Sequence, residues 1–300
     1  MTGIRVVAHA VRAPGIVDAG VLRRALADGR SLAGVPLDRS GLPQPAPGDR
    51  PEAIPIGAWR RMSPLSRWVA EVAVELLDGP AGRGHDRDAL VTVWGTAFGE
   101  LTTTSRFLER MVVEGADRVS PMAFQTSLFG TPLAHLSMAL GLRGPSETVS
   151  AGGATSAMAL IRGIDAIRAG APAALVIAGD EASDTIATAW ALAGGGPKVG
   201  EAVGAVLLAA AGPGGGPGVP IEVVPGIAPG AGPVYHRAIT LPGEGPRAAV
   251  GSEAIAVEPV VGSIPAGGLA WVAAACRGGG SVVEQDGRSA WTVRVGTCPD

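Results

Sequence analysis

The stretch Gly144–Ala182, GPSETVSAGGATSAMALIRGIDAIRAGAPAALVIAGDEA, contains two strand patterns, a glycine turn and a helix pattern. Thr148–Ala151 is a short strand-like run that leads into a Gly-Gly pair. Thr155–Arg168 carries its apolar residues at helical spacing, and Ala173–Ala178 is apolar throughout. A strand that is apolar at every position is covered on both faces. The stretch therefore predicts a layered α/β fold.

The same alternation extends outward on both sides of this stretch. Ser63 and Pro64 provide a capping hydroxyl and a proline at the first helical position, and residues 30–58 are rich in Pro and Gly, which favours a surface excursion. The expected strands are Ile4–Val11, Ala89–Trp94 and Gly204–Ala210, and the expected helices are Asp18–Ala27, Ser63–Leu77, Leu101–Val113, Thr126–Leu140 and Asp184–Leu192.

A segment with the composition of a linker, Gly212–Pro220, separates this part of the chain from a second, shorter alternation. We expect one domain with a first half over residues 1–212 and a reduced second half over residues 213–300. The expected elements of the second half are strands at Ile221–Val224 and Ala254–Val261, a helix at Pro265–Cys276, and a hairpin of Ser281–Glu284 with Ala290–Val295.

Composition excludes several functional classes. The chain is 47% hydrophobic and 17% charged, which excludes a disordered chain, and its net charge of −3 argues against nucleic-acid binding. Four scattered histidines and two cysteines, Cys276 and Cys298, fit no metal spacing, so we expect neither a metal nor a cofactor. No signal-peptide pattern or membrane-length apolar run is present, and we expect a cytoplasmic protein.

Several short motifs share the order and spacing of those in the β-ketoacyl synthases of the thiolase superfamily. The resemblance covers about the first two thirds of the chain, and it implies a thiolase-like, layered α-β-α-β-α fold with a shortened second half. The motifs that carry it are Gly144-Pro145, Thr148-Val149-Ser150, Ile167–Gly170, Ala178–Glu181, Val119-Ser120-Pro121, and Gly200-Glu201 with Gly204.

The groups that perform condensation in this family are missing from the matching positions. A cysteine is expected three residues after the Thr-Val-Ser motif, where a thiolate at a helix N-terminus carries the acyl chain. Gly153 occupies that position, and it has no side chain. His236 is followed by Arg-Ala instead of Gly-Thr, and Ser263 stands where the second histidine of the family is expected. The resemblance therefore implies a chain that cannot condense acyl groups alone.

Such departures resemble the chain-length factor of type II polyketide and aryl-polyene systems. This resemblance implies a heterodimer with an active ketosynthase, served by an acyl carrier protein, and contact with neither nucleic acid nor membrane. The family dimerises through the strand that here contains Glu147, Thr148, Val149 and Ser150. Side chains expected to line or close the acyl tunnel are Phe98, Met122, Ala123, Phe124 and Phe129.

Other interpretations of these residues stay open. The four bulky tunnel candidates fit ordinary core packing equally well. Ser150, Thr155 or Ser156 as a replacement nucleophile would make the chain a stand-alone acyltransferase or hydrolase, although none lies in a G-x-S-x-G motif. The Gly-Gly turn before a helix also fits a phosphate site, but the expected glycine spacing is absent. A homodimeric acyl-binding protein is a further alternative.

Overall fold

The computed structural model describes residues 3–14, 16, 18–28, 50–192, 200–212, 218–229, 234–239, 255–256, 272, 276, 279–286 and 289–296. The strands are β1 (Ile4–Arg12), β2 (Val91–Gly95), β3 (Ser146–Val149), β4 (Ala173–Asp180), β5 (Ala202–Ala210), β6 (Val219–Pro225), β7 (Val234–Ile239), β8 (Ile255–Ala256), β9 (Gly280–Asp286) and β10 (Ser289–Val295). The helices are α1 (Ala19–Ala27), α2 (Ile56–Trp59), α3 (Pro64–Asp78), α4 (Leu101–Glu114), α5 (Pro121–Thr126), α6 (Thr131–Leu140), α7 (Thr155–Arg168) and α8 (Asp184–Leu192). Two 3₁₀ turns are η1 (Ala116–Arg118) and η2 (Gly152–Ala154).

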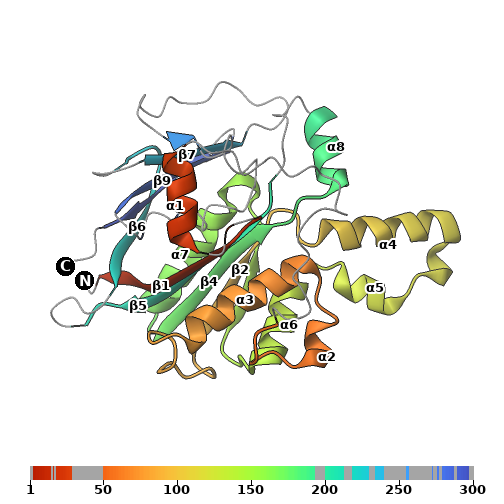
Figure 1. The fold of residues 1–300 in the computed structure, drawn as a ribbon, viewed down its shortest axis with the longest axis horizontal. Coiled ribbons are helices and arrows are strands. Elements are labelled where there is room, and N and C mark those ends of the chain that lie inside the picture. The colour runs from red at the N-terminus through yellow and green to blue at the C-terminus, as the bar shows by residue number, and fades with distance from the viewer. Residues whose placement is uncertain are drawn as a thin grey trace.

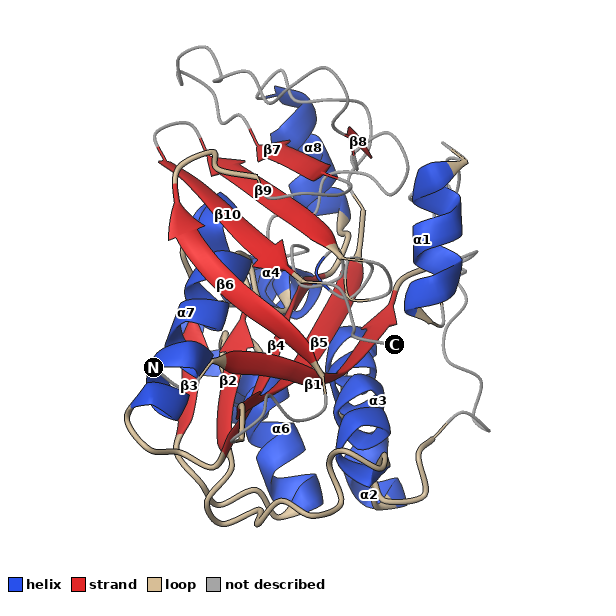
Figure 2. Ribbon diagram, turned by 90° about the vertical axis from the view of Figure 1, so that its left-hand side faces the viewer, coloured by secondary structure: helices blue, strands red, loops and turns tan. Residues whose placement is uncertain are grey.

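The strand order repeats across the middle of the sheet. The order is β3-β2-β4-β5-β1-β6-β10-β9-β7-β8. From β1 outward, the first pairings are antiparallel, antiparallel, parallel and parallel, and the same series is found from β6 outward. Figure 2 shows β6, β10, β9 and β7 continuing beyond β1. The described residues thus form two five-stranded halves of identical topology, joined by an antiparallel β1–β6 contact.

Helices cover both faces of the first half. Helix α3 contacts β1, β4, β5 and α6, whereas α7 contacts β2, β4 and β5 and also reaches β6 and β10 of the second half. Figure 1 shows α3 and α6 along one side of the strands β1, β4 and β5. The layers are therefore the helices α3 and α6, the first half of the strands, helix α7, and the second half of the strands. The predicted thiolase-like α/β class is confirmed.

Strand β4 shows why the apolar run is a central strand. Leu175 and Ile177 pack in the cluster under α3 and α6, while Val176 and Ala178 pack in the cluster around α7. Gly163 of α7 faces this strand, and a Cβ atom on it would lie 2.4 Å from Val176 Cγ2. Only glycine therefore allows α7 to approach β4 this closely.

Most element predictions that fall on described residues agree with the structure, but some do not. Thr126–Leu140 is not one helix: α5 ends at Thr126 and α6 begins at Thr131. Pro132 lacks the N–H that a continuous helix would donate to the Leu128 carbonyl, which explains the break. Strand β7 and helix α2 were not predicted. Ile255–Ala256 of the expected strand Ala254–Val261 form β8, and the rest of that prediction lies outside the described residues. The expected helix Pro265–Cys276 lies outside the described residues except for Val272 and Cys276.

Candidate functional site

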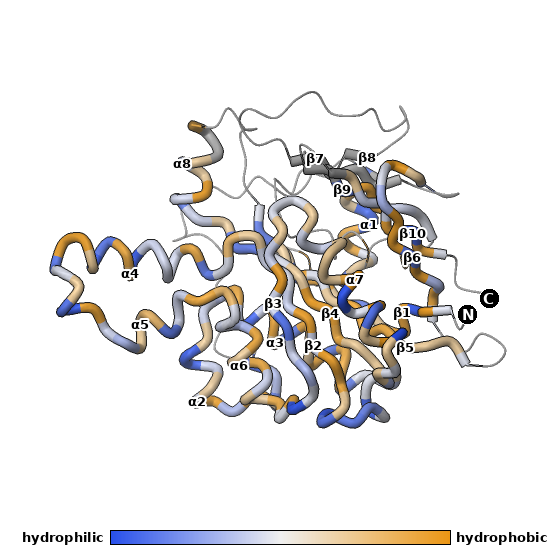
Figure 3. The backbone as a smooth tube through the Cα atoms, turned by 180° about the vertical axis from the view of Figure 1, so that it is seen from behind, coloured by the Kyte–Doolittle hydropathy of each residue, from blue (hydrophilic) through white to orange (hydrophobic). Residues whose placement is uncertain are grey.

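Helices α4 and α5 form an arm, residues 101–126, that projects from the body of the molecule (Figures 1 and 3). No residue of α4 or α5 is buried. Even so, the arm carries large apolar side chains, and Val112, Met122 and Phe124 are 80%, 61% and 52% exposed. Figure 3 shows apolar segments on both helices of the arm. An exposed apolar surface of this kind marks a site of association, because water disfavours it.

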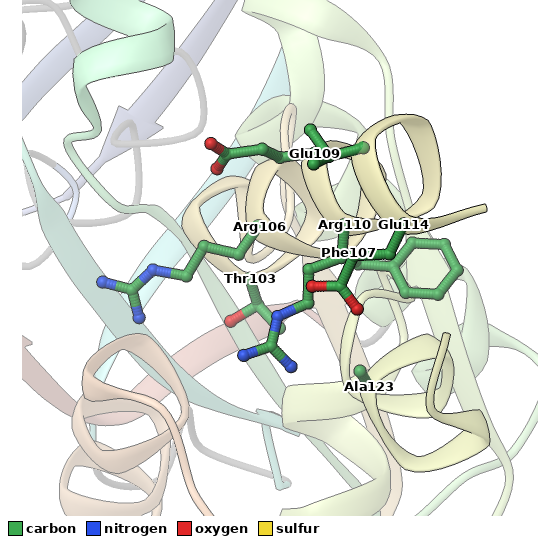
Figure 4. Close-up of a pocket in the computed structure, with 8 residues that line it drawn as sticks. Thr103, Arg106, Phe107, Glu109, Arg110, Glu114 and Ala123 are labelled. Atoms are coloured by element: carbon green, nitrogen blue, oxygen red, sulfur yellow. The ribbon is translucent and has the colours of Figure 1, made fainter. Parts of the chain in front are cut away.

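The two helices of the arm contact each other only in part. The rings of Phe107 and Phe124 lie 5.8 Å apart between centroids, and the Thr104 hydroxyl donates to the Ser127 carbonyl oxygen over 3.0 Å. A cavity of about 500 Å³ remains between the helices. Its lining residues, shown in Figure 4, are Thr103, Arg106, Phe107, Glu109, Arg110, Val113, Glu114 and Ala123.

Two buried carboxylates at the end of β4 fix the root of the arm, residues 96–100. Asp180 accepts hydrogen bonds from the Thr96 hydroxyl at 2.7 Å and from the backbone N–H groups of Ala97 and Phe98 at 3.0 and 3.1 Å. Glu181 accepts from the N–H of Thr102 at 2.6 Å, in the first turn of α4. An anion at this end of a helix satisfies an unpaired N–H and complements the helix dipole. Asp180 and Glu181 therefore hold the root of the arm and the start of α4 against the end of β4.

A third carboxylate, Glu100, joins the arm to α3. It is buried and accepts hydrogen bonds from the hydroxyls of Ser63 and Ser66. Burial raises the pKa of Glu100, the two serine hydroxyls oppose that change, and the charge of Glu181 adds to the rise; the net shift is upward. The position of α4 therefore depends on a titratable group.

The root brings two tunnel candidates together. Gly99 has a φ of 64°, and a Cβ atom on it would lie 2.8 Å from a ring carbon of Phe129. The half-buried Phe98 precedes Gly99, and the Trp94 indole N–H donates to the Phe129 carbonyl over 3.0 Å. Phe129 is itself 41% exposed. These side chains form a partly open surface where the arm meets the sheet.

Strand β3 leaves one edge of the sheet open beside this root. It pairs with β2, and no other described strand pairs with it (Figure 2). The N–H groups of Thr92 and Thr96 donate to the carbonyls of Pro145 and Val149, respectively. Because backbone groups alternate in direction along a strand, those of Ser146 and Thr148 point away from β2. They are available to a strand from another chain.

The turn before α7 is closed by a carboxylate from the second half. Gly153 is buried in η2, and the helix cap Ala154 has no side chain that can accept a hydrogen bond. Glu284 of β9, 1% exposed, accepts from the Ala157 N–H over 3.1 Å. The first turn of α7 thus donates a hydrogen bond to a carboxylate of the protein itself.

Comparison with known proteins identifies the family. The model described as "Beta-ketoacyl synthase, N-terminal domain" matches residues 38–214, more than half of the chain. The chain belongs to the β-ketoacyl synthase family. No curated protein sequence matches it.

Solved structures share the fold at low sequence identity. A ketosynthase in complex with its chain length factor from Xenorhabdus doucetiae is 16% identical, with a TM-score of 0.62 over 98% of this chain and 100% of that chain. The ishigamide ketosynthase/chain length factor is 17% identical, with a TM-score of 0.71 over 99% and 100%. A type II polyketide synthase acyl-carrier protein in complex with its ketosynthase is 15% identical, with a TM-score of 0.54 over 70% and 63%.

The residues predicted for the tunnel and the interface in this ketosynthase-like chain lie in one region. Met122, Ala123 and Phe124 are on the arm, Phe98 is in its root, and Phe129 lies against Gly99 of the root. Glu147, Thr148 and Val149 are in β3, and Ser150 follows its last residue. The Ser150 hydroxyl donates to the Ala97 carbonyl over 3.4 Å, which links the edge to the root. The exposure of Met122, Phe124 and Phe129 is unlike that of core residues. Their role at a tunnel stays a prediction.

The remaining chemical candidates have structural surroundings or are not described. Thr155 and Ser156 are fully buried, and the Thr155 hydroxyl donates to the Gly152 carbonyl and accepts from the Ala151 N–H. Neither hydroxyl is accessible to a substrate from solvent. Burial, with the charge of Arg61, lowers the pKa of His135. Ser263 and the side chain of His236 lie outside the described residues.

The described residues contain neither a metal-binding cluster nor a membrane-spanning helix. No group of three or more His, Cys, Asp or Glu side chains there is close enough to hold a metal ion. In the same part of the chain, no helix has both the length and the apolar character needed to cross a membrane.

Sequence reasoning missed Glu100 and Glu284. Glu284 had a recognisable signal, because it ends the short apolar run SVVE that was predicted to be a strand. A carboxylate in such a run needs a partner if it is buried. Its partner lies 127 residues away in the sequence, and only the fold identifies it.

Proposed function

We propose that this chain is a non-catalytic ketosynthase-like subunit, a chain-length factor, that forms a heterodimer with an active ketosynthase. The observation that carries the proposal is the exposed apolar surface of the arm, which adjoins the open edge of β3. A partner that adds a strand to β3 would also cover Met122 and Phe124. Association would then remove apolar surface from water and satisfy unpaired backbone groups.

The second part of the proposal is that the arm and its root shape the tunnel for the growing acyl or polyene chain. Phe98, Met122, Ala123, Phe124 and Phe129 are the side chains we assign to this role. Phe124 is held against Phe107, so its ring has a defined position at the proposed interface. A packed ring in the path of a chain stops its growth by steric overlap, because a closely packed interior does not accept added methylene groups.

The turn before α7 supports the proposed absence of catalysis. Gly153 has no nucleophile to offer, and the adjacent helix N-terminus already binds the Glu284 carboxylate. Ser263 is assigned to the position of a missing histidine on the resemblance alone. The acyl chain would be delivered to the active partner by an acyl carrier protein. The matched structures support these partners, because their descriptions name ketosynthase/chain length factor and ketosynthase/acyl-carrier protein complexes.

Co-expression with the ketosynthase encoded nearest to it tests the proposal. We expect a stable one-to-one complex by native mass spectrometry. Phe124→Glu is expected to abolish it, because a charge would be buried in the interface without a partner. Ile56→Glu is the matched control: Ile56 is 51% exposed, as Phe124 is 52%, but it lies on α2 outside the arm. We expect this control to leave the complex intact.

Two results would contradict the proposal. A folded chain that does not associate with the ketosynthase would favour a homodimeric acyl-binding protein if it self-associates. Measurable acyl transfer or hydrolysis by the chain alone, lost on Ser150→Ala, would favour the hydroxyl-nucleophile alternative. Ser150 is the exposed hydroxyl near the turn, and so it is the residue to substitute in that test.

A further inference from the structure

The N-terminus of α7 holds a carboxylate that belongs to the other half of the chain. Glu284 lies on β9 and is almost fully buried. Its Oε2 atom accepts a hydrogen bond from the Ala157 N–H over 3.1 Å, and β9 contacts the turn η2 directly. The sequence separation of 127 residues makes this a contact between the two topological halves.

A buried carboxylate needs strong compensation, because removing its charge from water is costly. The start of α7 supplies part of that compensation, at the Oε2 atom. Its first N–H groups have no intrahelical acceptors, and the aligned peptide dipoles give this end a partial positive charge. The helix lacks a local side-chain cap, since Ala154 occupies the cap position. Glu284 therefore performs the capping function from a distance.

We propose that Glu284 is a built-in anion that takes the electrostatic place of the missing thiolate at the start of α7 and fastens the two halves together. This inference rests on the part of the proposed function that identifies Gly153 as the vacated nucleophile position. It goes further, because it identifies the group that now uses the helix N-terminus. Replacement of Gly153 alone would therefore place a thiol beside an existing negative charge.

The proposal has a consequence for the pKa of a cysteine introduced at position 153. A helix N-terminus favours a thiolate and lowers its pKa, whereas a neighbouring carboxylate disfavours the thiolate and raises it. In Gly153→Cys we expect the carboxylate to dominate, because it already binds the first-turn N–H. In Gly153→Cys with Glu284→Gln, the helix N-terminus is expected to dominate. Glutamine has nearly the same shape and retains an oxygen that can accept from Ala157.

The experiment measures iodoacetamide alkylation at residue 153 from pH 6 to pH 10, by mass spectrometry of the peptide that contains it. Position 153 is buried, so the midpoint of the pH profile is the primary readout, because it reports thiol ionisation separately from access of the reagent. Full-length protein is used, alone or in its ketosynthase complex, with Cys298→Ser to reduce background labelling. We expect Gly153→Cys/Glu284→Gln to react at least about tenfold faster at pH 7.5 than Gly153→Cys, because each unit of pKa shift changes the thiolate fraction about tenfold. The midpoint of its pH profile is expected to be lower.

Glu222→Gln is the matched control. Glu222 lies on β6, at the exposed ion pair with Arg294, and lines a cavity beside the C-terminal end of α7. Its substitution removes the same charge from the second half without touching the helix N-terminus. Equal alkylation rates in Gly153→Cys/Glu284→Gln and Gly153→Cys/Glu222→Gln would overturn the proposal.

If Glu284→Gln does not fold, the thiol pKa of the Gly153→Cys single variant provides the test. Gly153→Cys with Glu284 intact should then show a thiol pKa no lower than that of an unstructured peptide. A clearly lower value would overturn the proposal, because the helix N-terminus would then be free to stabilise a thiolate. None of these outcomes depends on complex formation, so failure of this inference and failure of the proposed function are distinguishable.

Discussion

Phe124 is the single side chain with the most direct expected effect on the product. Its ring is half exposed on α5 and contacts Phe107 of α4. If this ring ends the tunnel, Phe124→Ala in the complex should shift the product distribution to longer chains, because removing the ring opens the space that it occupied. Chromatography with mass spectrometry of the products measures this. Ile56→Ala should leave the distribution unchanged, and an unchanged profile for Phe124→Ala would assign the ring to packing.

Glu100 makes the stability of the folded chain depend on pH. Its pKa in the folded chain is raised by burial, so the folded chain holds this proton more tightly than the unfolded chain does. The tighter binding of this proton stabilises the folded chain. This stabilisation is fully present below the pKa of Glu100 in the unfolded chain, and it is lost as the pH rises through the pKa in the folded chain. At neutral pH the buried carboxylate is therefore destabilising.

Glu100→Gln should relieve this cost, because glutamine cannot ionise and can still accept from Ser63 and Ser66. We expect its Tm to exceed that of the unsubstituted chain at pH 7 to 8, and the difference to shrink towards pH 4. Each unit of pKa shift removed is worth about 1.4 kcal/mol. Thermal denaturation across this range measures it, with the exposed Glu109→Gln as control. If the Tm of the unsubstituted chain and the Tm of Glu100→Gln changed in parallel with pH, the buried carboxylate would not be the cause of the destabilisation.

At the scale of elements, the open edge of β3 is the feature with a testable consequence. Thr148 directs its backbone N–H away from β2, so a proline here removes no hydrogen bond of the β2–β3 ladder. Thr148→Pro should therefore leave the chain folded but weaken the ketosynthase complex. The loss of one or two interchain hydrogen bonds costs about 1–3 kcal/mol, which is roughly a 5- to 150-fold increase in Kd. Calorimetric titration or competition measures this, and unchanged affinity would place the interface elsewhere.

The arm shows why helices can be predicted while their roles cannot. The start of α3 follows from Ser63 and Pro64, and the Ser63 hydroxyl accepts from the Ser66 N–H over 3.0 Å. Such capping signals are local. Helix α4 was also predicted, but its apolar residues would ordinarily indicate contact with the core. That they remain exposed depends on where the root of the arm directs the helix.

At the scale of the whole molecule, Cys276 reports whether the two halves are packed together. It lies in the cluster between the halves with Val272 and Ile164, and burial raises its pKa to about 12. In Cys298→Ser protein at pH 8, native Cys276 should react with iodoacetamide about a thousandfold more slowly than a free thiol. Labelling should rise with denaturant only as the chain unfolds. Rapid labelling without denaturant would show that the second half opens independently.

The sequence by itself determined the class of fold, and it carries the proposal that the nucleophile is missing. Apolar strands such as Ala173–Ala178, helix periodicity in Thr155–Arg168 and the glycine at position 153 are local features, because they depend on covalent identity and on spacing along the chain. Strand β7 and the break before Pro132 were missed, since the competing local patterns were ambiguous.

Only the tertiary structure decided which distant residues meet. Glu284 at the start of α7, Asp180 at the root of the arm and Phe129 against Gly99 are contacts between segments far apart in sequence. Burial and the direction of an unpaired strand edge are properties of packing, and they have no local signature. For this reason, Gly153 could be proposed as the vacated position from the sequence, whereas the Glu284 carboxylate at the start of α7 required the fold.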